Sequence, residues 1–310
     1  IGLQNAGIIV DSPTLVGLFN LKAALASGTI HTQGVAVMLA LFGILMIAYM
    51  FIKGIKGYML WGILITWGLG IVLQLIGFYV PNPKAGFYSV IPSAVFSMPS
   101  SMASTMFQFD FNFMVSHIGD FIVILFAFLF VDIFDTIGTV IGCAEKSGML
   151  DEHGKLPEIK GILLADAVGT TIGACLGTST ITTFVESSSG ISEGGRTGLT
   201  AVTTGVLFLL ALFFSPLFLT IPSFATAPAL MFVGFLMMQQ VTNINWQDLT
   251  KAIPAFVTIT MMGFAYSISD GIAFGFITYT ILHLCTGKKN ELSPLMYVLS
   301  VVFILKYFLV

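Results

Sequence analysis

The sequence predicts an all-α polytopic membrane protein, and three observations support that prediction. Of the 310 residues, 56% are apolar and only 9% are charged, whereas a soluble domain has about 45–50% apolar and about 25% charged residues. The mean hydropathy is +0.99. Several apolar runs are long enough to cross a bilayer. This composition excludes a soluble enzyme and a disordered chain, and the net charge of −3 leaves no basic surface for nucleic acid.

The spanning segments follow from the apolar runs in chain order. Crossing the bilayer core takes roughly 17–25 helical residues. Residues 1–10 have the pattern of the end of an apolar helix, and the chain begins with Ile1 rather than Met. We therefore expect a fragment whose upstream helices are absent. The expected spans lie at about 34–52, 57–80, 119–143, 160–177, 197–215, 224–241, 252–268 and 271–286, with a further apolar stretch over 293–310.

Two segments differ from these spans. Four prolines interrupt the region 81–118, where only a short amphipathic helix near 102–118 is expected.

Segment 178–196 is rich in Ser, Thr and Gly, yet it lies between two hydrophobic runs. If it crosses the membrane once, most basic residues fall on the cytoplasmic side, as the positive-inside rule requires, and only Lys22 and Lys84 fall outside. The cytoplasmic residues are then Lys53, Lys56, Lys146, Lys155, Lys160, Arg196, Lys251, Lys288 and Lys289.

Most acidic residues lie in loops or at the ends of the expected helices, and three do not: Asp132, Asp135 and Glu186. An ionisable group at the bilayer centre costs about 2.5–3.5 kcal/mol on insertion scales. Such groups therefore face protein or a cavity, and a functional role is the first hypothesis. A structural bond to a neighbouring helix is the alternative, above all for Asp135. Helical residues three and four apart share a face, which predicts one polar stripe on the span 119–143: Asp132, Asp135, Thr136 and Thr139.

The polar segment 178–196 predicts a short membrane-embedded strand followed by a half-helix. Residues 178–185 are rich in β-branched types, which favour strands, and the serines at 187–189 favour a helix start. A strand in lipid needs a partner for its backbone groups. No second such segment exists in these 310 residues, so the partner is expected upstream. Glu186 lies at the junction, where helix amides favour an anion or the polar edge of a ligand.

The remaining residue types indicate packing rather than chemistry. The three cysteines show no CxxC spacing and the four histidines no ligand spacing, so neither a metal nor a cofactor is predicted. Gly169, Gly173 and Gly177 recur every four residues, which lets helices approach closely in lipid. Asp166 is interpreted as a helix-end or inter-helix contact, and Arg196 as a cytoplasmic anchor.

Three stretches resemble the AzgA-like purine permeases of the nucleobase:cation symporter-2 superfamily. They are residues 129–139 (LFVDIFDTIGT), 177–190 (GTSTITTFVESSSG) and 193–202 (EGGRTGLTAV). These permeases carry hypoxanthine, guanine and adenine. The resemblance implies fourteen membrane segments in two inverted seven-segment repeats, with core and gate domains. It implies this division of the chain: residues 1–118 as the first-repeat gate helices with an extracytoplasmic connection, 119–215 as the second-repeat core, and 216–310 as the second-repeat gate.

The resemblance also implies a binding site and a mechanism. Family binding residues correspond to Asp132 and Glu186, with Asp135 as a supporting acid. Glu186 would hold a purine, Asp132 would bind or exchange the proton, and Phe184 with Thr183 would complete the substrate site. The partners would be a purine nucleobase and a proton in the cell membrane, with a homodimer as a candidate assembly.

Two other functions remain open from the sequence. An anion carrier of the sulfate-transporter type would share the strand and half-helix, but buried acids without buried Arg or Lys argue against an anionic substrate. A membrane enzyme would need a nucleophile–base or metal constellation, and none is visible.

Overall fold

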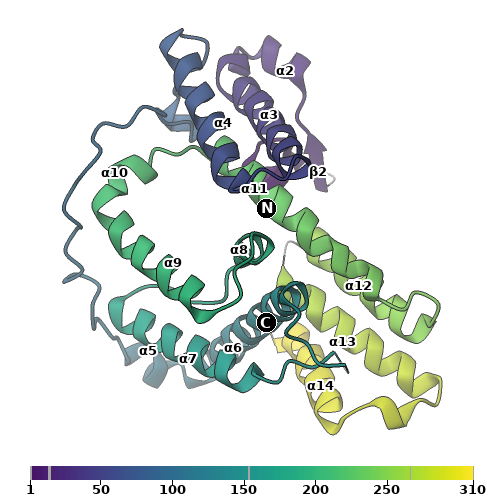
Figure 1. Cartoon of the computed structure of the whole chain (residues 1–310). Helices are drawn as coiled ribbons and strands as arrows, with labels where there is room; N and C mark the ends of the chain where they lie inside the picture. The colour runs from purple at the N-terminus through teal and green to yellow at the C-terminus, as the bar shows by residue number, and fades with distance from the viewer. Residues whose placement is uncertain (1, 13–14, 153, 266, 310) are drawn as a thin grey trace. The chain divides into compact units, whose positions relative to one another are not determined.

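The computed structural model describes residues 2–12, 15–152, 154–265 and 267–309, which are mostly helical (Figure 1). His153 and Val310 lie outside the described residues, as do the side chains of Phe130, Val131, Lys146 and Lys306. The chain divides into two compact units. The first is Ile1–Ser101 with Val185–Met238, and the second is Met102–Phe184 with Gln239–Val310.

The first unit is built on three long helices, α3, α4 and α11, which pack against one another. Its buried side chains include Ile47, Tyr58 and Phe232, and the Trp67 indole donates to the Val90 carbonyl at 2.8 Å. The elements of this unit are α1 (Gly2–Asn5), β1 (Ile9–Ser12), β2 (Leu15–Leu18), α2 (Leu21–Ala26), η1 (Thr29–His31), α3 (Gln33–Ile52), α4 (Tyr58–Leu75), η2 (Pro83–Ala85), α8 (Ser187–Ser192), α9 (Gly198–Ala211), η3 (Leu212–Phe214), α10 (Ser215–Phe218) and α11 (Ser223–Met238).

Close approach of α3 and α4 depends on Gly62. A Cβ at this position would lie 2.2 Å from Cγ1 of Ile47, a fully buried side chain on α3. Contact at that distance is impossible without moving one helix. Gly62 therefore sets the spacing of the pair, as small residues do between membrane helices.

The predicted helix over residues 1–10 is wrong beyond Asn5. Gly7 adopts φ +70°, and the Ile8 N–H donates to the Leu3 carbonyl at 3.1 Å, which is the hydrogen bond of a Schellman helix end. The β-branched run that follows favours a strand. Strands β1 and β2 form an antiparallel hairpin in which Ile9 pairs with Leu18.

The second unit contains the helix that carries two of the three predicted acids, Asp132 and Asp135. In it, α6 contacts α7 and α13, and α13 packs against α12 and α14. The short helix expected near 102–118 corresponds to α5. The elements of this unit are α5 (Asn112–Ser116), α6 (Ile118–Ser147), α7 (Ile159–Leu176), η4 (Gln239–Asn243), α12 (Leu249–Phe264), α13 (Ile268–Cys285), η5 (Lys289–Glu291) and α14 (Pro294–Leu309).

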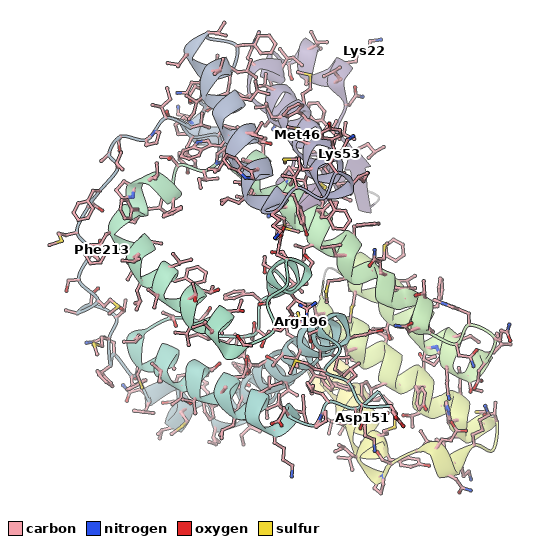
Figure 2. All side chains as sticks on the ribbon, in the orientation of Figure 1. Lys22, Met46, Lys53, Asp151, Arg196 and Phe213 are labelled. Atoms are coloured by element: carbon pink, nitrogen blue, oxygen red, sulfur yellow. The ribbon has the colours of Figure 1, made fainter. Side chains whose placement is uncertain are left out.

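The apolar surface confirms a polytopic membrane protein. Within the described residues, six helical stretches have the length and composition to cross a membrane, and two shorter apolar helices accompany them. Figure 2 shows mostly hydrocarbon side chains projecting from the helices. On α3, the side chains of Leu45 and Ile52 are 70% and 81% exposed. Water would not tolerate so much exposed apolar surface. The six stretches are Thr29–Ile52, Tyr58–Leu75, Ile159–Leu176, Gly198–Phe218, Ser223–Asn243 and Ile268–Cys285.

Candidate functional site

The polar stripe predicted on α6 faces other protein groups in the second unit. Thr136 is fully buried and Thr139 nearly so, whereas Asp132 and Asp135 are half-buried. Another face of α6 is apolar: the Phe134 ring lies 5.5 Å from the ring of Phe276 on α13, centroid to centroid. This aromatic contact helps to fix the rotation of α6.

Two threonines of the polar segment hold the two acids of α6. Thr180 donates its hydroxyl to Oδ1 of Asp132, and Thr182 donates its hydroxyl to Oδ2 of Asp135 at 3.4 Å. Alternate side chains of an extended chain point the same way, so residues 180 and 182 can both reach α6. We call Thr180 and Thr182 the threonine pair. The sequence analysis did not predict that these threonines bind the acids of α6. The signal was present, since Thr180 and Thr182 are two residues apart, as Asp132 and Asp135 are one helical turn apart.

The residue between the pair attaches the same segment to α7. The Thr170 hydroxyl donates to the Ile181 carbonyl at 3.0 Å. The same hydroxyl oxygen accepts a hydrogen bond from the Ile181 N–H at 3.2 Å. The Ile181 side chain fills the space above Gly173, where a Cβ would lie 2.8 Å from its Cδ1. Gly173 therefore serves packing of this segment against α7, whereas close approach of two helices at the glycines was expected.

Asp166 makes the inter-helix contact that the sequence suggested. The Thr136 hydroxyl on α6 donates to Oδ2 of Asp166 on α7 at 3.1 Å. Thr136 is fully buried, and lipid offers no hydrogen-bond partner. The bond to Asp166 therefore satisfies the Thr136 hydroxyl. The two helices are thus joined one turn away from the carboxylates held by the threonine pair.

The predicted half-helix is present, whereas residues 178–184 have no regular secondary structure. They form no β-ladder with any described residue, so a partner strand stays a prediction. Gly177, with φ +85°, ends α7 and starts the segment. α8 (Ser187–Ser192) follows with Glu186 as its N-cap residue.

The far end of α8 is fixed within the first unit. Glu193 accepts a hydrogen bond from the Gly57 N–H at 2.8 Å, and Ser192 Oγ lies 2.9 Å from the Tyr58 hydroxyl. Gly57 is the N-cap of α4, where a carboxylate is favoured by the helix dipole. Arg196 donates to the Ile191 and Gly195 carbonyls, so it closes the C-terminal end of α8.

The remaining predicted site residues have these positions. The side chains of Glu186 and Phe184 are exposed, and Thr183 is half-buried. The Glu186 carboxylate makes no hydrogen bond to another described residue. Glu186 belongs to the first unit, whereas Asp132, Asp135, Thr183 and Phe184 belong to the second. Their grouping into one binding site therefore stays a prediction.

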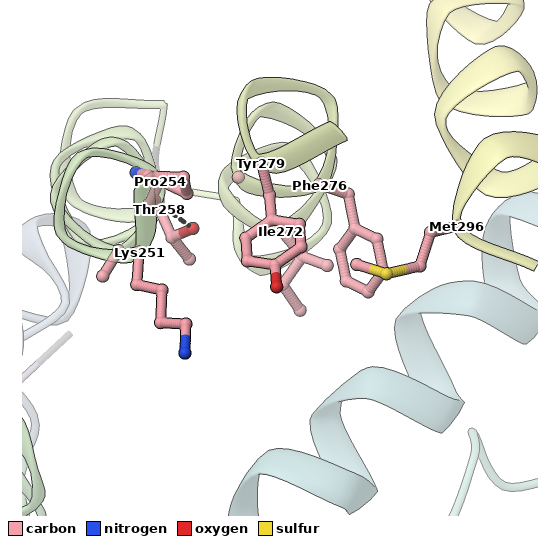
Figure 3. Close-up of a pocket in the computed structure, with 9 residues that line it drawn as sticks. Lys251, Pro254, Thr258, Ile272, Phe276, Tyr279 and Met296 are labelled. Atoms are coloured by element: carbon pink, nitrogen blue, oxygen red, sulfur yellow. Dashed lines mark hydrogen bonds between the residues drawn. The ribbon is translucent and has the colours of Figure 1, made fainter. Parts of the chain in front are cut away.

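A separate groove of about 300 Å³ lies in the second unit, between α12, α13 and α14 (Figure 3). None of the predicted site residues lines it. Its lining is mainly apolar, with one amine and one phenol: Lys251, Thr258, Ile272, Phe276, Tyr279 and Met296 are among the lining residues.

The fold and these contacts define a class: a multi-pass helical membrane protein with two acids held by hydroxyl groups. Comparison with known proteins gives the family. The family model described as "Permease family" (Xan_ur_permease) matches residues 1–274. The chain belongs to this permease family. Permeases are transporters rather than enzymes, and this chain, with its apolar helices, is a multi-pass protein of the cell membrane.

Individual relatives agree. The chain is 44% identical over 308 residues to a putative permease of Methanocaldococcus jannaschii, a match that covers 99% of this chain and 65% of that protein. It is 39% identical to the adenine permease AdeP of Escherichia coli, with 98% and 63% covered. It is also 39% identical to the guanine/hypoxanthine permease PbuG of Bacillus subtilis, with 99% and 64% covered. The chain thus spans just under two thirds of the length of these relatives.

Proposed function

We propose that this chain is part of a proton-coupled importer of purine nucleobases, with hypoxanthine and guanine as the first candidate substrates and adenine as the third. The names of the relatives support the purine class, since they include adenine and guanine/hypoxanthine permeases. The observation that carries the proposal is the pair of half-buried carboxylates on α6, each held by one threonine hydroxyl.

The chemistry of a purine suits a carboxylate site. Purines are planar and neutral, and their edges carry N–H groups. A carboxylate accepts two parallel hydrogen bonds from such an edge, which fixes orientation as well as affinity. In the proposal Glu186 accepts from the base, Phe184 contacts the ring face and Thr183 lies beside it. The exposed carboxylate of Glu186 has acceptor capacity left for a ligand.

Proton coupling is assigned to Asp132, with Asp135 in support. A carboxylate removed from water binds a proton more readily than a solvated one. A proton taken up on one side and released on the other would link the gradient to substrate binding. Movement would occur between a core of residues 119–215 and gate helices from 1–118 and 216–310.

The test is uptake of labelled purines by cells without their own purine permeases. Hypoxanthine, guanine and adenine should accumulate, and labelled sulfate should not. Sulfate uptake without purine uptake would support the anion carrier instead, and a chemically altered purine after uptake by purified protein in vesicles would support an enzyme.

Glu186→Gln should reduce purine uptake at least a hundredfold while surface abundance stays unchanged. The amide has the shape of the carboxylate but only one acceptor oxygen, so the parallel hydrogen bonds are lost. Arg196→Lys is the control for α8, because it retains the positive charge at the helix end. Uptake by the Gln variant within twofold of the parent protein would remove Glu186 from the site.

A further inference from the structure

The groove between α12, α13 and α14 begins near one end of these helices and extends inward, to Ile272 thirteen residues before the end of α13. Lys251 follows the start of α12 by two residues, and Met296 follows the start of α14 by two. Tyr279 precedes the end of α13 by six residues. Because consecutive spans run in opposite directions, these ends lie on one side of the membrane. At 1.5 Å per residue, Thr258 on α12 is about 10 Å deeper than Lys251.

The acidic residues at this end of the helices each have a basic partner, whereas one lysine beside the groove has no acidic partner among the described residues. The acid Asp248 is engaged, since its carboxylate lies 3.3 Å from Lys288 Nζ and accepts from Thr250. Glu291 lies 3.6 Å from His283. Lys251 lines the groove, and its amine has no ion pair or hydrogen bond with any residue that the structure describes. One cation is therefore left beside an apolar groove.

The polar groups of the groove fit an acceptor-only ligand. Figure 3 shows the Lys251 amine and the Tyr279 hydroxyl extending to the same side, while Phe276, Ile272 and Met296 supply hydrocarbon next to them. An amine and a phenol can both donate to a phosphate. A purine edge would also need acceptors, and no carboxylate lines the groove.

We propose that this groove binds one anionic phospholipid. Its phosphate is held by Lys251 and Tyr279, and the first part of an acyl chain lies along Phe276, Ile272 and Met296. The layout follows the bilayer: Lys251 lies near the helix end, whereas Phe276 and Ile272 lie deeper, nine and thirteen residues before the end of α13. Basic pockets between membrane helices on the cytoplasmic side are suited to anionic head groups, and the positive-inside pattern assigns this end to the cytoplasm.

Native mass spectrometry of the protein purified in mild detergent tests the proposal. Phosphatidylglycerol and phosphatidylcholine with identical acyl chains are added at equal concentration. One phosphatidylglycerol should be retained in preference to phosphatidylcholine. Lys251→Gln should lower its retention about fivefold, the effect expected for one basic residue near an anionic surface. Lys251→Arg should retain the lipid, and Lys289→Gln, a neighbouring lysine that does not line the groove, should bind as the parent does.

A second variant addresses the apolar part. Ala255 lines the groove, so Ala255→Phe should fill it and lower retention of both lipids, with an unchanged monodisperse profile as the folding check. Equal retention of the two lipids by the parent, or full retention by Lys251→Gln, would overturn the proposal. Displacement of the lipid by glycerol phosphate at equal concentration would show a phosphate site without an acyl chain. Loss of a dimer in Ala255→Phe with lipid retention unchanged would show an interface between copies.

Discussion

Thr180 and Thr182 determine the environment of the two acids on α6. Each hydroxyl donates to one carboxylate oxygen and so helps to orient it. The threonine pair comes from a segment without secondary structure. The orientation of the acids is therefore coupled to the position of that segment.

Thr180→Val should lower purine uptake about tenfold, because Asp132 loses the hydroxyl that orients its carboxylate. Thr180→Ser should restore uptake, since it keeps the hydroxyl. Initial uptake rates measure the effect, with surface abundance measured in parallel. A Val variant whose uptake stays within twofold of the parent would contradict the role of Thr180.

Asp132 should matter more than Asp135. The positive-inside pattern puts Asp132 farther than Asp135 from the cytoplasmic end of α6, and Asp132 shares a helix face with Thr136. Asp132→Asn should abolish accumulation against a gradient, while Asp135→Asn should retain at least a tenth of it. Accumulation ratios in energised cells distinguish the variants, with abundance measured in parallel. Equal losses, or a greater loss in Asp135→Asn, would reverse the assignment.

Among the helices, α12 and α13 are joined at their shared end by one polar cluster. Asp248 is the N-cap of α12 and accepts from the Thr250 N–H at 3.1 Å and the Thr250 hydroxyl at 2.6 Å. Lys288, just beyond α13, lies 3.3 Å from the same carboxylate. The Thr250 hydroxyl is the main cause that lowers the pKa of Asp248 to about 2, with the Thr250 N–H and Lys288 acting in the same direction.

This lowered pKa predicts a pH-dependent contribution to stability. The folded state holds the charged carboxylate better than the unfolded state, whose pKa is the ordinary 3.8. The contribution is therefore complete above about pH 4 and is lost as the pH falls toward 2. Asp248→Asn should lower the melting temperature at pH 6, and the difference from the parent should shrink between pH 4 and 2.

Thermal unfolding in detergent, followed by circular dichroism, measures that difference. Lys288→Gln should give a smaller decrease with the same pH dependence, because it removes one of the three donors. Glu158→Gln, at the exposed start of α7, serves as a carboxylate control. A difference between Asp248→Asn and the parent that stays constant from pH 6 to pH 2 would contradict the argument.

For the whole molecule, hydropathy was enough to predict the class and the long helices. The expected spans 34–52 and 160–177 correspond closely to α3 and α7. The hairpin at Ile9–Leu18 was missed because a short apolar run has the same composition in a helix and in a strand. The two inverted seven-segment repeats stay a prediction.

The site was less predictable than the helices, for a physical reason. An acid in an apolar run is visible because its insertion is costly. Its partner is not visible, since the bond from Thr180 to Asp132 joins residues 48 positions apart. Sequence periodicity reports one face of one helix and carries no information about which loop returns to it.

The proposed proton coupling is a prediction about the whole transporter. In vesicles, an inward proton gradient should drive purine accumulation above equilibrium, and a protonophore should reduce it to the equilibrium ratio. The proposed exchange at Asp132 is the physical reason. A sodium gradient of equal size, imposed at constant pH, is the control. Accumulation that survives the protonophore but follows sodium would contradict proton coupling.

Helix α8 has a mechanical consequence that its length makes clear. Six residues span only about 9 Å, and an isolated helix of that size is unstable in water. α8 is nevertheless held at its far end, where Glu193 and Ser192 bond to Gly57 and Tyr58 and Arg196 covers its last carbonyls. Glu186 stands at the opposite end of this short rod. A rotation of the turn between α3 and α4 would therefore move α8 as one body. The Glu186 carboxylate would change position while α8 stays helical.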